Sequence, residues 1–361
     1  MSDDSFSRIR SDESVIVFPT TARLVTERTE DGEARFWEVP VHGWIFEWED
    51  DSLWRRGALS MLRRVLELDD EPADGDPRAA SEAAIFRRRA RAFLVDNERG
   101  KRLRVRIDGR DYPLSASDAG GHFEGIAKVP AAAKGPERAP DWIDVRVLGR
   151  GEEGPSFPGR IQRVGAQGWV VVSDIDDTIK RTDVHSKRAL LRSSFLLEFE
   201  AIPGMAAVYR GFAHDGASFE YLSSSPWQLY PELSAFFDAT GLPPGGWHLQ
   251  RFRAKDRTFW SLFSSPEARK SAVLEALLAR SPQQRFVWIG DSAEQDPEIY
   301  GAIARAHHDR DIHIAIRRVT EDTADGPRWS AAFEGIDRSR WLLFDDPAEL
   351  AKFVARTETR D

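Results

Sequence analysis

Apolar residues alternate with polar ones through much of the first 150 residues, which is the pattern of half-buried β-strands. Trp44, Phe46 and Trp48, for example, recur at every second position. The predicted strands are residues 15–18, 22–26, 36–48, 103–107, 122–129 and 142–148. Leu53 to Leu68 has near-helical spacing of its leucines and predicts one amphipathic helix. We therefore expect residues 14–149 to form a β-rich, sandwich-like N-terminal domain with one helix.

The pattern changes from residue 160 onward, where short apolar runs alternate with segments of helical periodicity. Strands are predicted near 168–173, 219–223, 286–290, 312–316 and 341–344, and helices near 204–213, 227–239, 266–280, 297–308 and 347–356. This alternation predicts an α/β domain over residues 160–361, with a parallel sheet covered by helices on both faces. Residues 1–13 are polar and are expected to be a disordered tail, and residues 150–159, rich in Gly and Pro, a linker.

Composition narrows the class of protein. The chain has 361 residues, of which 41% are hydrophobic, so two globular domains are expected. The net charge of −9 argues against a nucleic-acid binder, and the basic run within 85–95 is interpreted as a solvated strand edge. The sequence contains no run of 18 apolar residues, so no transmembrane helix is predicted. The N-terminus lacks the apolar stretch of a signal peptide. With no cysteine, the expected location is cytoplasmic, with peripheral contact to a membrane left open.

The segment from Trp169 to Lys180 joins a strand pattern to a cluster of acids. Asp174, Asp176 and Asp177 follow the strand within four residues. Open α/β sheets bind ligands at the carboxyl ends of their strands. Crowded carboxylates repel one another unless a cation or a reaction compensates. One carboxylate can attack phosphorus while a second protonates the leaving oxygen, so the pattern suits phosphoryl transfer, although an acidic turn has the same sequence.

Two later segments carry groups that can hold a phosphate. Ser223 and Ser224 end another apolar run, and hydroxyl and backbone N–H groups there can bind phosphate oxygens. Taken alone, this segment is better explained as a plain Ser-rich turn before a helix. Lys270 lies in the first turns of a helix that starts at Pro266, where the helix dipole disfavours a cation. That position suggests that it neutralises phosphate, although a solvated lysine is the commoner case.

A third segment supplies candidate metal ligands. Asp291 follows Gly290 at the end of an apolar strand, and Asp296 comes five residues later. Carboxylates are the hard oxygen ligands that Mg²⁺ prefers. Asp296 is also placed to cap the helix that starts at Pro297.

In this order the four segments resemble the haloacid dehalogenase superfamily of phosphohydrolases. Their wording is similar to the actin-patch-protein type of phosphatidate phosphatase, a relative of the lipins. The residues that carry the resemblance are 173–180, 202–205, 221–227, 289–292 and 296–300, within a similar region of about residues 157–350. The resemblance implies a haloacid-dehalogenase-like Rossmannoid sheet. Only about 40 residues separate the first two motifs, so a minimal cap is expected.

The resemblance also implies roles for individual residues. Asp174 would be the nucleophile, and Asp176 the general acid and then the base. The phosphate would be held by Thr178, Ser223, Ser224 and Lys270. Mg²⁺ would be bound by Asp174, by the backbone carbonyl of Asp176 and by Asp291, with Asp296 orienting its waters. Lys180 and Trp227 are further candidates for contact with the substrate.

The implied function is that of a Mg²⁺-dependent phosphomonoester hydrolase that works through an aspartyl-phosphate and converts phosphatidate to diacylglycerol at a membrane surface. Two alternatives stay open. One is a phosphatase of a soluble or protein-bound phosphoester, because the same machinery serves many substrates. The other is a non-catalytic adaptor that binds a partner through the β-rich domain. The oligomeric state is not predicted.

Overall fold

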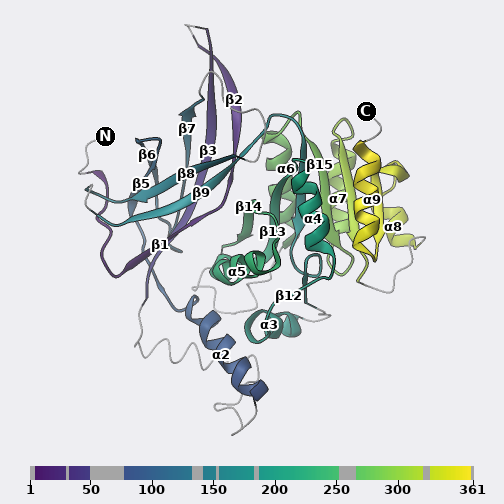
Figure 1. The fold of residues 1–361 in the computed structure, drawn as a ribbon, viewed down its shortest axis with the longest axis horizontal. Coiled ribbons are helices and arrows are strands. Elements are labelled where there is room, and N and C mark those ends of the chain that lie inside the picture. The colour runs from purple at the N-terminus through teal and green to yellow at the C-terminus, as the bar shows by residue number, and fades with distance from the viewer. Residues whose placement is uncertain are drawn as a thin grey trace. The chain divides into compact units, whose positions relative to one another are not determined.

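The computed structural model describes residues 5–29, 32–48, 77–131, 141–151, 154–182, 187–251, 266–319 and 326–358. They form two compact units, one built mainly from the chain up to Gly165 and the other mainly from Ala166 onward. In Figure 1 the first unit runs from purple to teal and the second from teal to yellow. Each unit has its own cluster of buried apolar side chains.

The first unit is a nine-stranded sheet. Its strands are β1 (Glu13–Phe18), β2 (Thr21–Thr29), β3 (Gly32–Glu47), β4 (Asp96–Asn97), β5 (Arg102–Ile107), β6 (Arg110–Ala116), β7 (His122–Pro130), β8 (Asp141–Leu148) and β9 (Ser156–Val164). Their order is β1-β3-β2-β9-β8-β5-β6, and β4 and β7 also pair with β3. Val39 and Val41 of β3 are buried in the core. The alternation predicted from Trp44, Phe46 and Trp48 is only partly observed, because Ile45 is buried as well as Trp44 and Phe46, and Trp48 is 39% exposed. The β-rich prediction for this region is confirmed.

The helix of this unit differs from the prediction. The helix expected at residues 53–68 lies outside the described residues. The structure instead has α2 (Pro77–Arg91), where part of a strand was predicted at 85–95. That prediction is wrong because Ile85 and Phe86 are buried on a helical segment that begins with several alanines, which are strong helix formers.

The predicted tail and linker are also more ordered than expected. Residues are described from Ser5, and Ile9 is 3% exposed because it packs in the core. The linker predicted at 150–159 overlaps β9, in which Pro158 pairs with Arg146 of β8. A Cβ on Gly159 would lie 2.5 Å from Val17, so this glycine permits close packing rather than a flexible joint.

The second unit is a six-stranded sheet with the order β14-β13-β10-β15-β16-β17. The strands are β10 (Trp169–Asp174), β13 (Ser218–Pro226), β14 (Gly246–Gln250), β15 (Arg285–Asp291), β16 (Ile312–Arg317) and β17 (Trp341–Phe344). Neighbours from β13 to β17 pair in parallel. Every residue of β10 is buried, which explains its continuous apolar run. The predicted α/β fold is therefore confirmed.

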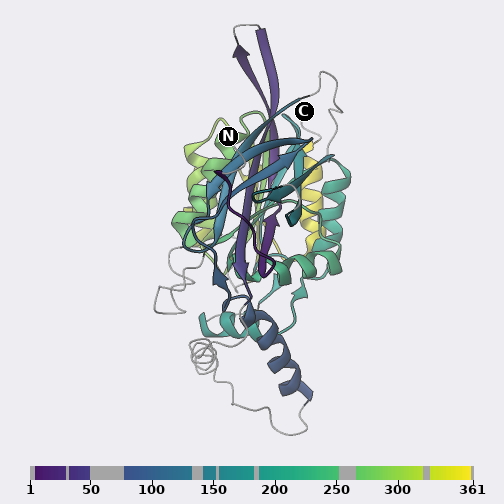
Figure 2. The same ribbon diagram turned by 90° about the vertical axis from the view of Figure 1, so that its left-hand side faces the viewer.

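Helices cover both faces of this sheet. They are α4 (Met205–His214), α5 (Tyr230–Thr240), α6 (Pro266–Arg280), α7 (Asp296–Ala306), α8 (Pro327–Ala332) and α9 (Pro347–Glu358). In Figure 2 the sheet lies between the yellow helix α9 and the green helices of the opposite face. Trp288 of β15, Leu274 of α6 and Tyr300 of α7 belong to one buried cluster, so this face is closed by apolar packing.

The insertion between β10 and α4 is small. Its described residues form the two-stranded ribbon β11 (Lys180–Arg181) and β12 (Glu200–Ala201), with α3 (Lys187–Leu196) between them. This agrees with the minimal cap expected from the short spacing. The sequence pattern predicted neither α3 nor β14 nor α8.

Candidate active site

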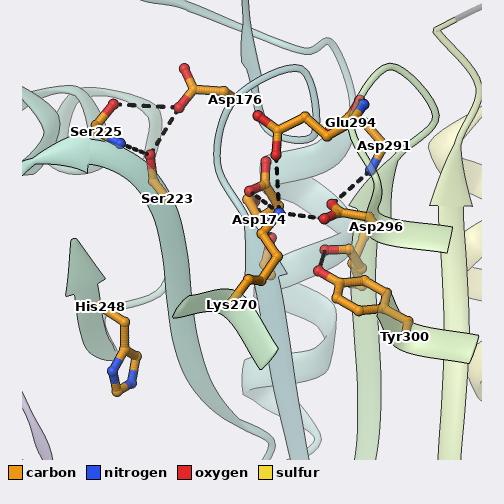
Figure 3. Close-up of polar contacts among 12 residues, drawn as sticks. Asp174, Asp176, Ser223, Ser225, His248, Lys270, Asp291, Glu294, Asp296 and Tyr300 are labelled. Carbon is orange, nitrogen blue, oxygen red and sulfur yellow. Dashed lines mark hydrogen bonds and ion pairs between the residues drawn. The ribbon is translucent and has the colours of Figure 1, made fainter. Parts of the chain in front are cut away.

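Three parallel strands bring the predicted acids and serines to one edge of the second sheet. Asp174 of β10 lies opposite Leu222 of β13, and the preceding Ser173 lies opposite Ile289 of β15. The carboxyl ends of these strands therefore meet, and the next residues of each turn toward a common site (Figure 3).

The centre of the site is a triad of buried acids. One oxygen from each of Asp174, Asp291 and Asp296 lies within 4.8 Å of the others. All three residues are at most 1% exposed. Among the described residues, neither Asp174 Oδ2 nor Asp291 Oδ2 has a hydrogen-bond partner. Burial, reinforced by neighbouring carboxylates, raises the pKa of both groups well above the usual range. A close group of buried carboxylates with oxygens left unpartnered is a donor set that fits a hard divalent cation.

Lys270 holds two members of this triad together. Its Nζ donates to Asp174 Oδ1 at 3.0 Å, to Glu294 Oε2 at 3.2 Å and to Asp296 Oδ1. Burial opposes the charge of this ammonium, but the surrounding acids hold the pKa of Lys270 well above its usual range. α6 thus directs Lys270 into the site from another part of the chain (Figure 3). Its predicted role in holding phosphate stays a prediction.

Gly290 allows the acids to approach this closely. A Cβ at this position would lie 2.2 Å from Asp296 Oδ2, so only glycine leaves room for that carboxylate. Asp296 Oδ2 also accepts a hydrogen bond from the backbone N–H of Asp291 at 3.3 Å. Asp296 is the first residue of α7, and its carboxylate turns to Lys270 and Asp291 rather than capping its own helix.

Asp176 lies in a second polar group beside the triad. Its Oδ2 accepts from Ser223 Oγ at 2.9 Å and from Ser225 Oγ at 3.4 Å, and its Oδ1 pairs with Lys180 Nζ at 2.6 Å. Burial alone would raise the pKa of Asp176, but Lys180 and the hydrogen bonds from Ser223 and Thr182 hold it below the usual range. Figure 3 shows this carboxylate turned toward the serines and away from Lys270. In this arrangement Asp176 is a carboxylate.

Some predicted residues do not join these contacts in the way expected. Ser225, and not the half-buried Ser224, joins Ser223: its N–H donates to Ser223 Oγ at 2.9 Å. Thr178 is fully buried, and its hydroxyl has no hydrogen-bond partner among the described residues. Trp227 is 3% exposed and packs against Tyr230 with ring centroids 6.2 Å apart.

The motifs missed three residues that shape the site. Ser225 could have been found, because residues two apart on a strand share a face. Glu294 lies between the two predicted acids, but its contact with Lys270 depends on α6. Arg269 donates to the backbone carbonyl of Ser223 and, at 3.4 Å, to that of His248, and these contacts join three separate segments.

Comparison with known proteins agrees with this geometry. Residues 169–318 match the family model described as phosphatidate phosphatase APP1, catalytic domain. The resemblance inferred from the motifs is thereby confirmed for this part of the chain. The matched region includes all three acids of the triad and Lys270.

Individual relatives are similar to part of the chain. Phosphatidate phosphatase APP1 of Saccharomyces cerevisiae is 29% identical over 207 residues, which are 56% of this chain and 34% of that protein. The uncharacterized protein C29B5.04c of Schizosaccharomyces pombe is 32% identical over 171 residues, which are 46% of this chain and 28% of that protein. The chain thus spans about a third of the length of these relatives.

Among solved structures, phosphoserine phosphatase in its apo form is 12% identical and covers 51% of this chain and 97% of its own, with a TM-score of 0.31. At that value the similarity supports no further conclusion. None of the described helices is both long and apolar enough to cross a membrane.

Proposed function

We propose that this protein is a Mg²⁺-dependent phosphomonoester hydrolase and that its substrate is phosphatidate, which it converts to diacylglycerol and phosphate. The observation that carries the reaction class is the buried triad of Asp174, Asp291 and Asp296 with Lys270 beside it. The similarity to a yeast protein named phosphatidate phosphatase supports the choice of a lipid. A lipid substrate implies reaction at a membrane surface, and we expect a cytoplasmic, peripheral location.

In the first step, one carboxylate oxygen of Asp174 forms a bond to phosphorus. The ester P–O bond breaks, its electron pair stays on the alcohol oxygen, and that oxygen takes a proton from Asp176. Lys270 donates to Asp174 Oδ1 and fixes the plane of the attacking group. Ser223, together with Ser224 or its neighbour Ser225, would donate hydrogen bonds to the transferring phosphoryl oxygens.

In the second step, water attacks the phosphorus of the aspartyl-phosphate and gives a proton to Asp176. The P–O bond to Asp174 then breaks, which restores its carboxylate and releases phosphate. Asp176 is held as a carboxylate in the structure, which is the form that this second step needs. Its role as an acid in the first step requires a proton and therefore a weaker contact with Lys180. A substrate phosphate would attract Lys180 and have that effect.

Asp174 and Asp291 would hold the cation, because each has a buried oxygen without a partner among the described residues. The backbone carbonyl of Asp176 would complete the protein's contribution, and Asp296 would orient bound water. When bound, Mg²⁺ neutralises the charge that develops on the phosphoryl oxygens. Thr178 lies in the same loop and braces it in this proposal.

The test is phosphate release from phosphatidate in mixed micelles, with and without Mg²⁺, beside a soluble aryl phosphate. Asp174→Asn is run in parallel with Asp215→Asn, an exposed control at the end of α4. We expect Mg²⁺-dependent release from the lipid that is lost only in Asp174→Asn. Release from the aryl phosphate alone would keep the phosphatase and remove the lipid. Release from neither would favour the adaptor.

A further inference from the structure

The loop between Asp291 and Asp296 carries two of the three buried acids, and its backbone is fixed from the inside by Asp291. Asp291 Oδ1 accepts hydrogen bonds from the N–H groups of Ala293, at 2.6 Å, and Glu294, at 3.0 Å. Because Oδ1 is committed to these two bonds, Oδ2 is the oxygen left without a partner among the described residues. The orientation of the loop peptides therefore decides which oxygen of Asp291 is presented.

The same loop is fixed from the outside by Arg328 of α8. Its Nη1 donates to the carbonyl of Ser292, and its Nη2 donates to the carbonyl of Glu294 at 2.7 Å. The guanidinium also pairs in bidentate fashion with Glu298 of α7, at 2.7 and 3.0 Å. One planar group thus joins the loop to the helix that begins with Asp296.

The peptide between Ser292 and Ala293 is held at both of its ends. Its carbonyl accepts from Arg328, and its N–H donates to Asp291 Oδ1. In a trans peptide the C=O and N–H groups point in opposite directions, so fixing the carbonyl aims the N–H. We infer that Arg328 is a positioning residue for the cation site: it orients the loop so that Asp291 Oδ1 is occupied and Oδ2 faces the triad.

This role goes beyond the comparisons, because residues 169–318 match the family model and Arg328 lies past its end. A lysine could not replace it, since a single ammonium cannot reach two carbonyls and both oxygens of Glu298 in a fixed plane. The inference rests on the proposed function only for the existence of a cation site at the triad.

The test measures metal binding by the free protein, without turnover. Mn²⁺ is titrated into the wild type, Arg328→Met, Arg328→Lys and Arg305→Met, and free Mn²⁺ is followed by electron paramagnetic resonance. Arg305 is a matched control, because it also donates to backbone carbonyls at the end of α8, those of Ala332 and Glu334, and these described hydrogen bonds do not involve the loop. Thermal unfolding of each protein is recorded beside the titration.

We expect Arg328→Met to weaken Mn²⁺ binding about 10-fold or more, as outer-sphere contacts to metal ligands typically do. Arg328→Lys should fall between the wild type and Arg328→Met, and it replaces Arg328→Met should that variant not fold. Arg305→Met should bind Mn²⁺ with an affinity within about twofold of the wild type, even if it lowers Tm as much as Arg328→Met does.

Two results would overturn the inference and leave the proposed function intact: unchanged Mn²⁺ affinity in folded Arg328 variants, or an equal loss in Arg305→Met. Wild-type protein that binds no Mn²⁺ would remove the cation site of the proposed function, and the role of Arg328 with it.

Discussion

Each unit of this protein contains a buried acid, and Glu13 and Asp174 differ in how fully their oxygens are paired and in the direction of their pKa shifts. In the first unit, Glu13 has a fully buried side chain whose oxygens are both engaged: Arg10 donates to them from its N–H and its Nε, at 2.9 and 2.7 Å, and Lys101 pairs with Oε1. Burial would raise the pKa of Glu13, but these partners hold it below the usual range. In the second unit, Asp174 keeps one oxygen without a described partner, and its pKa is raised.

In the proposed function, this difference separates an acid that supports the fold from one that takes part in the reaction. A buried carboxylate is costly unless its oxygens are satisfied, so a structural acid such as Glu13 is fully paired. The triad of Asp174, Asp291 and Asp296 has one lysine for three carboxylates, which leaves a site that would stabilise a cation. Incomplete pairing at a buried position is therefore informative about function.

Substitution of Asp174 is the most direct test of whether this acid differs from the structural acid Glu13. Asp174→Asn should lower phosphate release by about 10⁴-fold or more, because Asp174 forms the covalent intermediate in the proposed mechanism. Its free energy of unfolding, measured in urea, should stay within about 1 kcal/mol of the wild type or rise, since a poorly compensated buried charge is removed. A variant that unfolds at much lower urea would show that Asp174 is a structural acid like Glu13.

Gly290→Ala tests the position of Asp296 in the triad, because it displaces this acid without removing it. The new Cβ would collide with the carboxylate of Asp296, at 2.2 Å from Oδ2. We expect stability to fall by about 1–3 kcal/mol and turnover to fall about 100-fold, because a displaced ligand sphere misplaces the reacting groups. Gly211→Ala is the control, since a Cβ there meets nothing within 4 Å. Full activity in folded Gly290→Ala would show that Asp296 can move freely.

Glu13→Gln tests the structural member of the pair. Removing one partner of a buried ion pair should cost about 3 kcal/mol in the free energy of unfolding, less than for a wholly buried pair because Arg10 is 52% exposed. The rate of phosphate release per folded molecule should not change. Glu27→Gln, whose pair with Lys128 is exposed at both ends, is the control and should cost under about 1 kcal/mol.

The smallest expected effect is a pH dependence of the free energy of unfolding that comes from His122 in the first unit. Burial, helped by the charge of Arg251 and opposed by Asp118, lowers the pKa of His122 to about 4. The unfolded chain binds this proton below about pH 6.5, whereas the folded protein binds it only below about pH 4. His122 therefore does not affect the free energy of unfolding above pH 6.5. Between pH 6.5 and 5 it should cost about 2 kcal/mol. His122 also contacts His42 at 3.2 Å. Urea unfolding of His122→Gln across this range should show a shallower pH dependence than the wild type. An equal slope would contradict the prediction.

Much of the second unit could be predicted from sequence because its strands are buried on both faces and therefore appear as continuous apolar runs. The acids at their carboxyl ends followed from the same reasoning. Ser225 rather than Ser224 could have been chosen once Ser223 was placed in the site, since alternate residues of a strand share a face, and Ser223 and Ser225 both donate to Asp176. Glu294 was missed because it is contacted by Lys270 of α6, a distant part of the chain. Arg328 was missed because it lies on α8, outside every motif, and reaches the loop only in the folded protein.

In the first unit the failures have a different cause. Alternating strands were found, but α2 was assigned partly to a strand because its short apolar run carries no clear period. The order of the nine strands is set by pairing between distant segments, as in β2 with β9, and local patterns do not contain that information.

The pairing of β16 with β17 bears on how this protein can be divided for study. A recombinant fragment ending at residue 318, where the family match stops, would lack β17 and α8. The edge of β16, with the sequence Ile-His-Ile-Ala-Ile, would then be open to other chains, and such exposed apolar edges promote aggregation. The smallest well-behaved catalytic fragment should therefore extend at least through Phe344 and, to keep α9 on the sheet, through residue 358.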